Sequence, residues 1–307
     1  MLSKLKYPII LDGGLSNVLE DFGCDLNNEL WVANLLNTNP EAIIKTHLAY
    51  LKAGAQIIST SSYQATIPGF MKLGFNEHES KALILKSVEL AHIALQRYYE
   101  KYDPKHKPLI AASIGPYGAF LADGSEYRGH YTLSDKDLAE FHRKRINLLD
   151  ESNCDLLAFE TIPSIQEIKV LCEILKTIKT PSWVSLSCKD GSSINDGTSI
   201  KEAAALIKDE PNIFAIGINC TAPKYISSLV TALKSAVGNK KIIVYPNSGE
   251  SYNAKSKTWV KNSNPIAFAE MTSEWIELGA DIVGGCCRIG PTHIKNISNL
   301  SKNRFNS

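Results

Sequence analysis

The sequence lacks the features that would place a chain in a membrane or on a nucleic acid. All of its apolar runs stay below the roughly 18 residues that a transmembrane helix needs. Its 33 basic and 32 acidic residues leave a net charge of +1, which gives no strongly basic surface for a polyanion. The first six residues, Met1 to Lys6, lack the apolar centre of a secretory signal peptide. We therefore expect a cytoplasmic protein whose partners are small molecules.

Disulfide frameworks and the commonest site motifs are also missing. The seven cysteines are odd in number and lack the spacing of a small disulfide-rich domain, which indicates a reducing compartment. No G-x-G-x-x-G follows the first apolar run, and none of the seven histidines belongs to an HExxH motif. His47, His92 and His142 lie in helical patterns, so we expect structural roles for them. With 307 residues, 44% of them apolar, the chain can form one large domain over residues 1–307.

Short apolar runs alternate with helical patterns along the whole chain. The runs are residues 9–11, 56–59, 109–112, 156–159, 183–186, 214–217, 242–245 and 281–283. They are continuously apolar, which is typical of strands buried on both faces. Such strand–helix units without an intervening linker predict an α/β fold, a single (β/α)8 barrel of the TIM type. The alternative, an open doubly wound sheet, accounts less well for the even spacing.

Helix-start signals support the segments between the runs. They are an N-cap before proline at Asn39-Pro40 and two capping boxes, Ser164 with Glu167 and Ser199 with Glu202. In a barrel, the chemistry is carried at the carboxyl ends of the strands. Three loops that follow strands are long, namely 13–38, 116–133 and 247–264. We expect them to cover the site as lids or binding walls.

Three cysteines give the strongest functional signal. Cys220 ends one predicted strand, and Cys286 and Cys287 follow another after two glycines. If these strands are parallel, the three thiols meet at one end of the sheet, and three thiolates with one open position are a pattern of catalytic zinc. Such a centre is a weak Lewis acid but holds a fourth thiolate well, which favours thiol attack over hydrolysis. For the remaining cysteines we expect roles as small buried hydrophobes.

Two carboxylates, Asp12 and Glu160, end the first and fourth predicted strands. They can hold the ammonium group of an amino acid, or act as a general acid and base. Asp12 stands before two glycines, so it can also simply orient nearby backbone amides. Arg288 follows the cysteine pair, where it can bind a carboxylate or pair with a neighbouring acid.

Together these residues resemble the zinc-dependent homocysteine S-methyltransferases. The resemblance runs from about Ile9 to about Ile297 and is carried by Asp12-Gly13-Gly14, Gly217-Ile218-Asn219-Cys220 and Gly284-Gly285-Cys286-Cys287-Arg288. It implies a barrel, homocysteine as the methyl acceptor and Zn²⁺ on Cys220, Cys286 and Cys287. The homocysteine contacts that it implies are Asp12, Gly13, Tyr63, Gln64, Glu160 and Asn219. The chain departs from the family pattern at Leu15-Ser16-Asn17, where small residues or threonine are common.

Motifs in the long loops resemble the branch that takes methyl groups from S-methylmethionine or S-adenosylmethionine. Aromatic faces hold a desolvated cation, and polar groups hold the amino-acid end of such a donor. The donor contacts that we expect are Tyr117, Glu126, Tyr127, Asn247, Glu250 and Trp259. The predicted reaction is direct attack of a metal-bound homocysteine thiolate on the sulfonium methyl group, which yields methionine. We expect S-methylmethionine as the preferred donor and S-adenosylmethionine as the second.

Three alternatives stay open from the sequence. A non-catalytic zinc or redox-sensing protein can use the same thiols, but it needs a fourth protein ligand that the sequence does not offer nearby. A module of a corrinoid-dependent methionine synthase would need a cobalamin region, which this chain lacks. A homocysteine methyltransferase can also use another donor, such as betaine.

Overall fold

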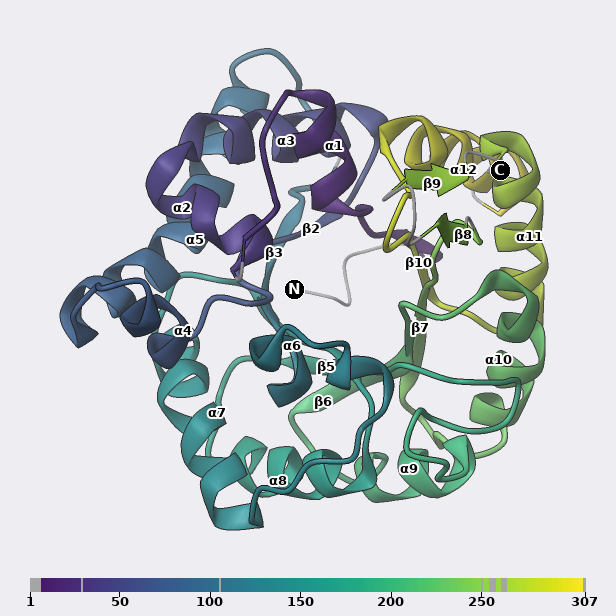
Figure 1. Ribbon diagram of the computed structural model, residues 1–307. Coiled ribbons are helices and arrows are strands. Elements are labelled where there is room, and N and C mark those ends of the chain that lie inside the picture. Colours follow the sequence, from purple (N-terminus) through teal and green to yellow (C-terminus); the bar gives the residue numbers. More distant parts are fainter. Residues whose placement is uncertain are drawn as a thin grey trace.

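The computed structural model contains a ring of eight parallel strands surrounded by helices (Figure 1). It describes residues 7–28, 30–104, 106–249, 264–305 and the backbone of 251–253 and 258–260. The strands are hydrogen-bonded in the order β1-β10-β7-β6-β5-β4-β3-β2. A parallel bridge between Leu11 and Ile57 joins the two ends of this order. The predicted (β/α)8 barrel is confirmed, and the open doubly wound alternative is wrong.

Each strand of the ring overlaps one of the predicted apolar runs. The strands are β1 (Ile9–Ile10), β2 (Ile57–Ser59), β3 (Leu109–Ile114), β4 (Leu156–Ile162), β5 (Ser182–Leu186), β6 (Ile213–Asn219), β7 (Lys241–Tyr245) and β10 (Ile282–Val283). Alternate side chains point in opposite directions from a strand. One set fills the barrel interior, where the Trp183 indole donates to the Tyr245 hydroxyl at 2.9 Å. The other set packs under the helices, which explains why the runs are apolar without a break.

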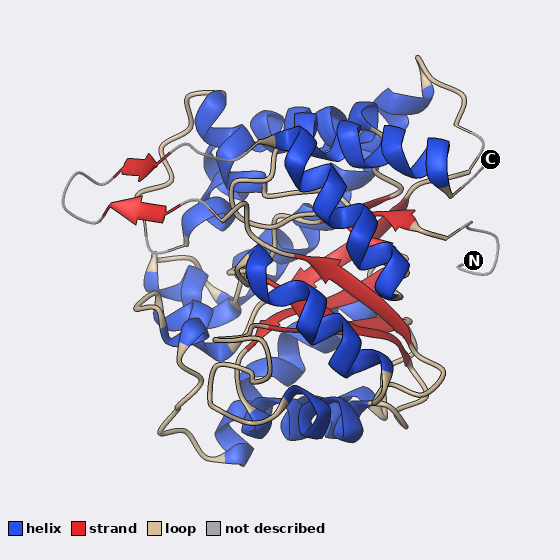
Figure 2. Ribbon diagram, turned by 90° about the vertical axis from the view of Figure 1, so that its right-hand side faces the viewer, coloured by secondary structure: helices blue, strands red, loops and turns tan. Residues whose placement is uncertain are grey.

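One helix returns the chain after each strand. These helices are α3 (Pro40–Ala53), α5 (Glu77–Tyr99), α7 (Asp135–Asp150), α8 (Ile165–Leu175), α9 (Ile200–Ile207), α10 (Ile226–Lys234), α11 (Pro265–Leu278) and α12 (Pro291–Arg304). Figure 2 shows them surrounding the strands from the side. Within the described residues, no helix is long and apolar enough to cross a membrane.

The long loops carry secondary structure of their own. The inserted elements are α1 (Leu15–Asp21), η2 (Trp31–Asn34), α2 (Leu35–Thr38), α4 (Ile67–Lys72), α6 (Tyr117–Leu121), η3 (Ser125–Tyr127), η4 (Pro223–Tyr225), β8 (Ser251–Asn253) and β9 (Thr258–Val260). The antiparallel pair β8–β9 projects from the body of the barrel, at the left of Figure 2. The sequence did not predict this hairpin.

One of the three helix-start predictions is fully confirmed. Asn39 accepts a hydrogen bond from the amide of Ala42 at the start of α3. Ser164 caps α8, but the Glu167 side chain does not return to it, because it bonds with loop and helix groups elsewhere. Ser199 makes no side-chain cap hydrogen bond. The two predicted capping boxes are therefore wrong as reciprocal pairs.

Candidate active site

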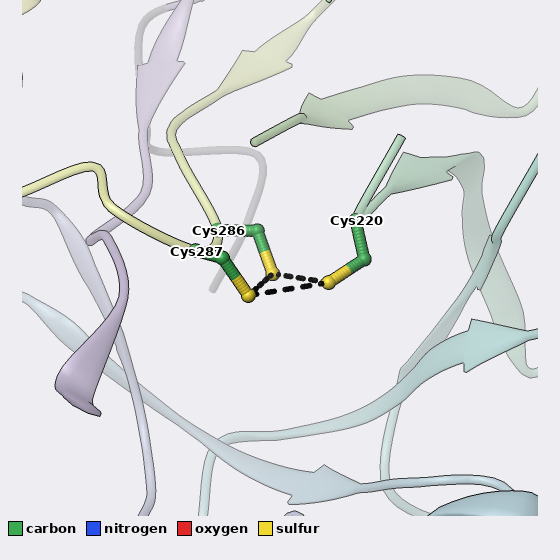
Figure 3. A group of neighbouring side chains, drawn as sticks. All are labelled: Cys220, Cys286 and Cys287. Carbon is green, nitrogen blue, oxygen red and sulfur yellow. Dashed lines mark hydrogen bonds between the residues drawn. The ribbon is translucent and has the colours of Figure 1, made fainter. Parts of the chain in front are cut away.

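The three predicted thiols converge at one end of the barrel (Figure 3). Cys220 follows β6 directly, and Cys286 and Cys287 lie in the turn after β10. The Cys220 sulfur is 2.9 Å from that of Cys286 and 3.7 Å from that of Cys287, and the last two sulfurs are 4.0 Å apart. The other four cysteines of the chain do not join this cluster.

The thiol cluster suits one tetrahedral metal ion. Two sulfurs bound at about 2.3 Å to the same zinc ion lie about 3.8 Å apart. Two of the three observed separations are close to this value, and the Cys220–Cys286 pair would have to open by roughly one ångström. Among the described residues, no fourth cysteine, histidine or carboxylate joins the three. The donor set therefore fits zinc with one coordination position left for a substrate.

The thiols of this cluster do not ionise alike. Hydrogen bonds from Cys220 and Cys286 hold the pKa of Cys287 well below its usual range. The same contacts with Cys220 and Cys287, together with burial, raise the pKa of Cys286. A cation is needed to stabilise several thiolates at this distance from one another.

The two glycines after β1 allow the cysteine turn to approach closely. A side chain at Gly13 would stand 2.2 Å from the carbonyl oxygen of Ile289, and one at Gly14 would stand 2.6 Å from that of Cys286. The Tyr50 hydroxyl lies 2.6 Å from the Gly14 carbonyl oxygen and 2.9 Å from that of Ile289. Only glycine permits this contact, which fixes the cysteine turn against the first strand.

A cavity of about 370 Å³ opens above the thiols. The predicted site residues that line it are Asp12, Gly13, Tyr63, Gln64, Glu126, Tyr127, Glu160, Cys220, Cys286 and Cys287. Several buried acceptor atoms of these residues have no hydrogen-bond partner within the described structure. They are Oε1 of Gln64, Oε2 of Glu126 and Oε1 of Glu160. The unpaired acceptors favour a ligand that donates hydrogen bonds, such as an ammonium group.

Asp12 and Glu160 differ in how they are held. Ser59 donates to both oxygens of Asp12, through its amide at 2.7 Å and its hydroxyl at 3.2 Å. Burial raises the pKa of Asp12 to about 8 despite these bonds. Burial, together with the charges of Asp12 and Cys220, raises the pKa of Glu160 to about 8 as well. A bound cation would stabilise the charged form of both groups.

Asn219 lies behind the cavity wall and does not line it. Its side chain accepts from the Thr161 amide at 2.7 Å and donates to the Thr161 hydroxyl at 2.8 Å. Thr161 has a φ of 61°, in the left-handed region that disfavours a β-branched residue. Asn219 thus stabilises the strained end of β4, directly after Glu160.

Backbone strain concentrates around the cavity. In the described chain, the non-glycine residues with positive φ are Trp31, Ala122, Thr161, Cys220 and Arg288. The first four line the cavity, and Arg288 follows the cysteine pair and forms an ion pair with Glu20 at 3.2 Å. Such conformations persist where the surrounding structure fixes them, which is typical of active sites.

The expected donor contacts divide into three groups. Glu126 and Tyr127 line the cavity, and the Tyr127 hydroxyl is 3.6 Å from the Cys220 sulfur. Tyr117 and Asn247 do not line it, and the Tyr117 ring instead packs against the rings of Phe120, Tyr131 and Phe141. Glu250 and the side chain of Trp259 lie outside the described residues.

Trp31 is a cavity residue that the sequence did not predict. It is the single tryptophan of the long loop 13–38, and an aromatic residue in a long loop at this end of the barrel could have indicated a binding role. Ser61, Thr161 and Tyr245 also line the cavity without having been predicted as contacts.

Comparison with known proteins agrees with this geometry. A family model described as homocysteine S-methyltransferase matches residues 9–301. The chain belongs to this family. The two cysteine motifs and the first-strand glycines all fall inside the matched range.

Individual members of the family are similar over nearly their whole length. The chain is 45% identical to homocysteine S-methyltransferase YbgG of Bacillus subtilis, over 95% of this chain and 94% of that protein. It is 45% identical to a selenocysteine Se-methyltransferase of Brassica oleracea var. italica, over 97% of this chain and 90% of that protein. The metallated form of the homocysteine methyltransferase MmuM from Escherichia coli matches with a TM-score of 0.87 at 38% identity, covering 97% of this chain and 98% of that one.

Proposed function

We propose that this homocysteine S-methyltransferase uses S-methylmethionine as its preferred methyl donor and zinc as its metal. The observation that carries the proposal is the position of the thiol cluster, which lies in a cavity lined by buried acceptors without partners. Methylation of homocysteine gives methionine, and demethylation of S-methylmethionine gives a second methionine. The cytoplasm is the location that we propose, because three reactive thiols need a reducing compartment.

Cys220, Cys286 and Cys287 would hold the zinc ion. When bound, zinc lowers the pKa of a coordinated thiol and so supplies homocysteine in its nucleophilic form. The chain itself has to place the rest of homocysteine and the donor. Orientation of two reactants can contribute roughly 7–11 kcal/mol to lowering a barrier.

Glu160 is the residue that we assign to the homocysteine ammonium group. Its Oε1 is buried without a partner, and it lies close enough to Cys220 for the thiolate charge to raise its pKa. Gln64 offers a second unpaired acceptor, while its amide nitrogen donates to the Ala119 carbonyl at 2.9 Å. These two groups can select an amino acid whose thiol points to the metal.

Trp31, Tyr127 and Glu126 are the residues that we assign to the donor. The first two supply aromatic faces for a sulfonium cation, and the carboxylate of Glu126 supplies charge. Glu126 Oε2 is buried without a partner, which suits the ammonium group of S-methylmethionine. Betaine has no N–H donor, so it would leave this acceptor unpaired at a cost of about 1–3 kcal/mol.

The test compares donors on one enzyme preparation. Methionine formation is measured with saturating homocysteine and S-methylmethionine, S-adenosylmethionine or glycine betaine, with zinc-loaded and zinc-stripped protein. We expect the highest kcat/KM with S-methylmethionine, a lower value with S-adenosylmethionine and no measurable turnover with betaine. Betaine turnover equal to that of S-methylmethionine contradicts the donor assignment, and full activity after zinc removal contradicts the metal assignment.

A further inference from the structure

A buried charged network lies behind the cavity wall and has no part in the chemistry described so far. Glu167 comes from α8, His142 and Arg145 come from α7, and none of the three is more than 1% exposed. None of them lines the cavity. Burying charged groups is costly unless they are paired and hydrogen-bonded, so the partners of this network indicate its purpose.

Glu167 binds both ends of the segment that covers the cavity. Its Oε1 accepts from the Tyr117 amide at 2.7 Å, and its Oε2 accepts from the Tyr131 hydroxyl at 3.1 Å. The Tyr131 oxygen in turn accepts from the Gly118 amide at 3.1 Å. One carboxylate therefore holds the start of α6 and the end of the loop 116–133 together.

His142 and Arg145 extend the hydrogen-bond network from this carboxylate. Arg145 donates to His142 Nδ1 at 3.4 Å, and because an arginine only donates, Nδ1 must be an acceptor. The proton of the neutral ring is then on Nε2, which donates to Glu167 Oε1 at 2.7 Å. Arg145 also donates to the Gly115 carbonyl at 2.7 Å and to the Tyr63 carbonyl at 3.4 Å. The network thus joins the ends of β2 and β3 to the covering segment.

The backbone of Gly118 connects the anchored segment to the cavity residue Glu126. A side chain at Gly118 would stand 2.4 Å from the backbone nitrogen of Glu126, so the two backbones are in direct contact. On its other side, the Glu126 carbonyl accepts from the Ser187 hydroxyl at 3.2 Å. Glu126 and Tyr127 are therefore clamped in place at the cavity, and the Glu167–Tyr131 pair forms one side of the clamp.

We propose that Glu167, through Tyr131, is a positioning residue for the methyl donor, because it fixes the backbone that presents Glu126 and Tyr127 to the cavity. The assignment of these two residues to the donor rests on the proposed function. Glu160, which is assigned to the homocysteine ammonium group, and Asp12 lie at the ends of β4 and β1, outside the segment that Glu167 anchors. Of the homocysteine contacts assigned above, Gln64 bonds to this segment, through the Ala119 carbonyl at 2.9 Å. Loss of the anchor should therefore affect the two substrates unequally.

The experiment removes the Glu167–Tyr131 bond from either side. Tyr131→Phe deletes the hydroxyl. Glu167→Gln removes the negative charge and replaces one oxygen by an amide nitrogen, which weakens the bonds to Tyr131, Tyr117 and His142. In each variant, KM for S-methylmethionine should rise on the order of 10-fold, while the Kd for homocysteine on zinc-loaded protein changes less than about 2-fold. The double variant should be little worse than the poorer single variant, because both changes disrupt the same Glu167–Tyr131 bond. Tyr98→Phe, which deletes a hydroxyl on the outer helix α5, is the matched control.

Hydrogen exchange of zinc-loaded protein without donor tests the anchor independently of donor identity. Exchange in peptides covering 116–133 should become faster in Tyr131→Phe and Glu167→Gln, with the strand peptides unchanged. If wild-type enzyme uses S-adenosylmethionine instead, the donor assignment fails, but the exchange result and the KM ratio with that donor still test the anchor. Unchanged exchange in 116–133, or equal losses for both substrates with faster exchange throughout the barrel, would overturn the proposal.

Discussion

Both carboxylate oxygens of Asp12 accept hydrogen bonds from Ser59, one from the backbone amide and one from the hydroxyl. These bonds cross from the end of β1 to the end of β2, beside the bridge between Leu11 and Ile57 that joins the two strands. Glu160 lies in the same cavity but keeps a buried oxygen without a partner. Glu160 can therefore accept a hydrogen bond from a substrate through this oxygen, whereas both oxygens of Asp12 already bond to Ser59.

We expect Glu160→Gln to weaken homocysteine binding about 10- to 150-fold, since a hydrogen bond to a charged group contributes roughly 1.5–3 kcal/mol. Zinc content should not change. Titration of homocysteine into zinc-loaded protein measures the effect, with the exposed Glu202→Gln as control. Unchanged affinity would remove Glu160 from this role.

For Asp12→Asn, we expect mainly a loss of stability. The variant keeps one acceptor oxygen for Ser59, but its amide nitrogen cannot accept the second Ser59 hydrogen bond, so the free energy of unfolding should fall by about 1–3 kcal/mol. Urea denaturation measures this, and homocysteine affinity should fall less than in Glu160→Gln. A larger affinity loss in Asp12→Asn than in Glu160→Gln would assign the ammonium group to Asp12 instead.

Serine in place of Cys220, Cys286 or Cys287 should reduce bound zinc from about one ion per chain to near zero and abolish activity. A serine hydroxyl is a much poorer zinc ligand than a thiolate. Circular dichroism should show that the barrel still folds. Cys24→Ser, outside the cluster, is the control. Full zinc occupancy in all three variants contradicts a three-thiol site.

Trp31→Leu should lower kcat/KM for S-methylmethionine by roughly 2- to 30-fold, the range of a cation–π contact worth about 0.5–2 kcal/mol. Homocysteine affinity should change little. Trp259→Ala tests the sequence-based prediction that the Trp259 ring also contacts the methyl donor. If neither variant alters donor kinetics, the cation is held without these two aromatic side chains.

His47 should make stability depend on pH. Within the described part of the chain, both ring nitrogens are buried without a hydrogen-bond partner, and burial lowers the pKa to about 4 from the usual 6.5. Between these values the unfolded chain binds the proton and the folded chain does not, so stability falls as pH drops from 6.5 to 4. Over this window His47 should account for about 3 kcal/mol of the loss. His47→Leu should flatten the pH profile of urea denaturation relative to the exposed His78→Gln, and parallel profiles would refute the assignment.

The barrel and the convergence of the three thiols could be predicted because their signals are direct. Strands buried on both faces need continuous apolar runs, and the residues that follow parallel strands meet at one end of the barrel. Cys220, Cys286 and Cys287 occupy such positions, and so do Asp12 and Glu160. The positions of the strands therefore determine at which end of the barrel these side chains lie.

The loop residues could not be placed in this way, because a loop has no period that sets the direction of a side chain. Tyr117 and Tyr127 lie in one predicted loop, but one ring packs against the helices and the other lines the cavity. Glu167 matched a capping box three residues after Ser164, yet its partners lie 25 and more residues away in sequence. Such long-range competition for a side chain is invisible to a local motif.

The three proposed metal ligands all lie in the last third of the chain, whereas the acids assigned to the two substrates lie in the first 160 residues. The last strand, β10, inserts between β7 and β1 and brings the cysteine turn with it. A ribosome must therefore synthesise almost the entire polypeptide before the three thiols can meet. If the thiols bind zinc as proposed, a chain that stops before Cys286 would lack two of the three ligands.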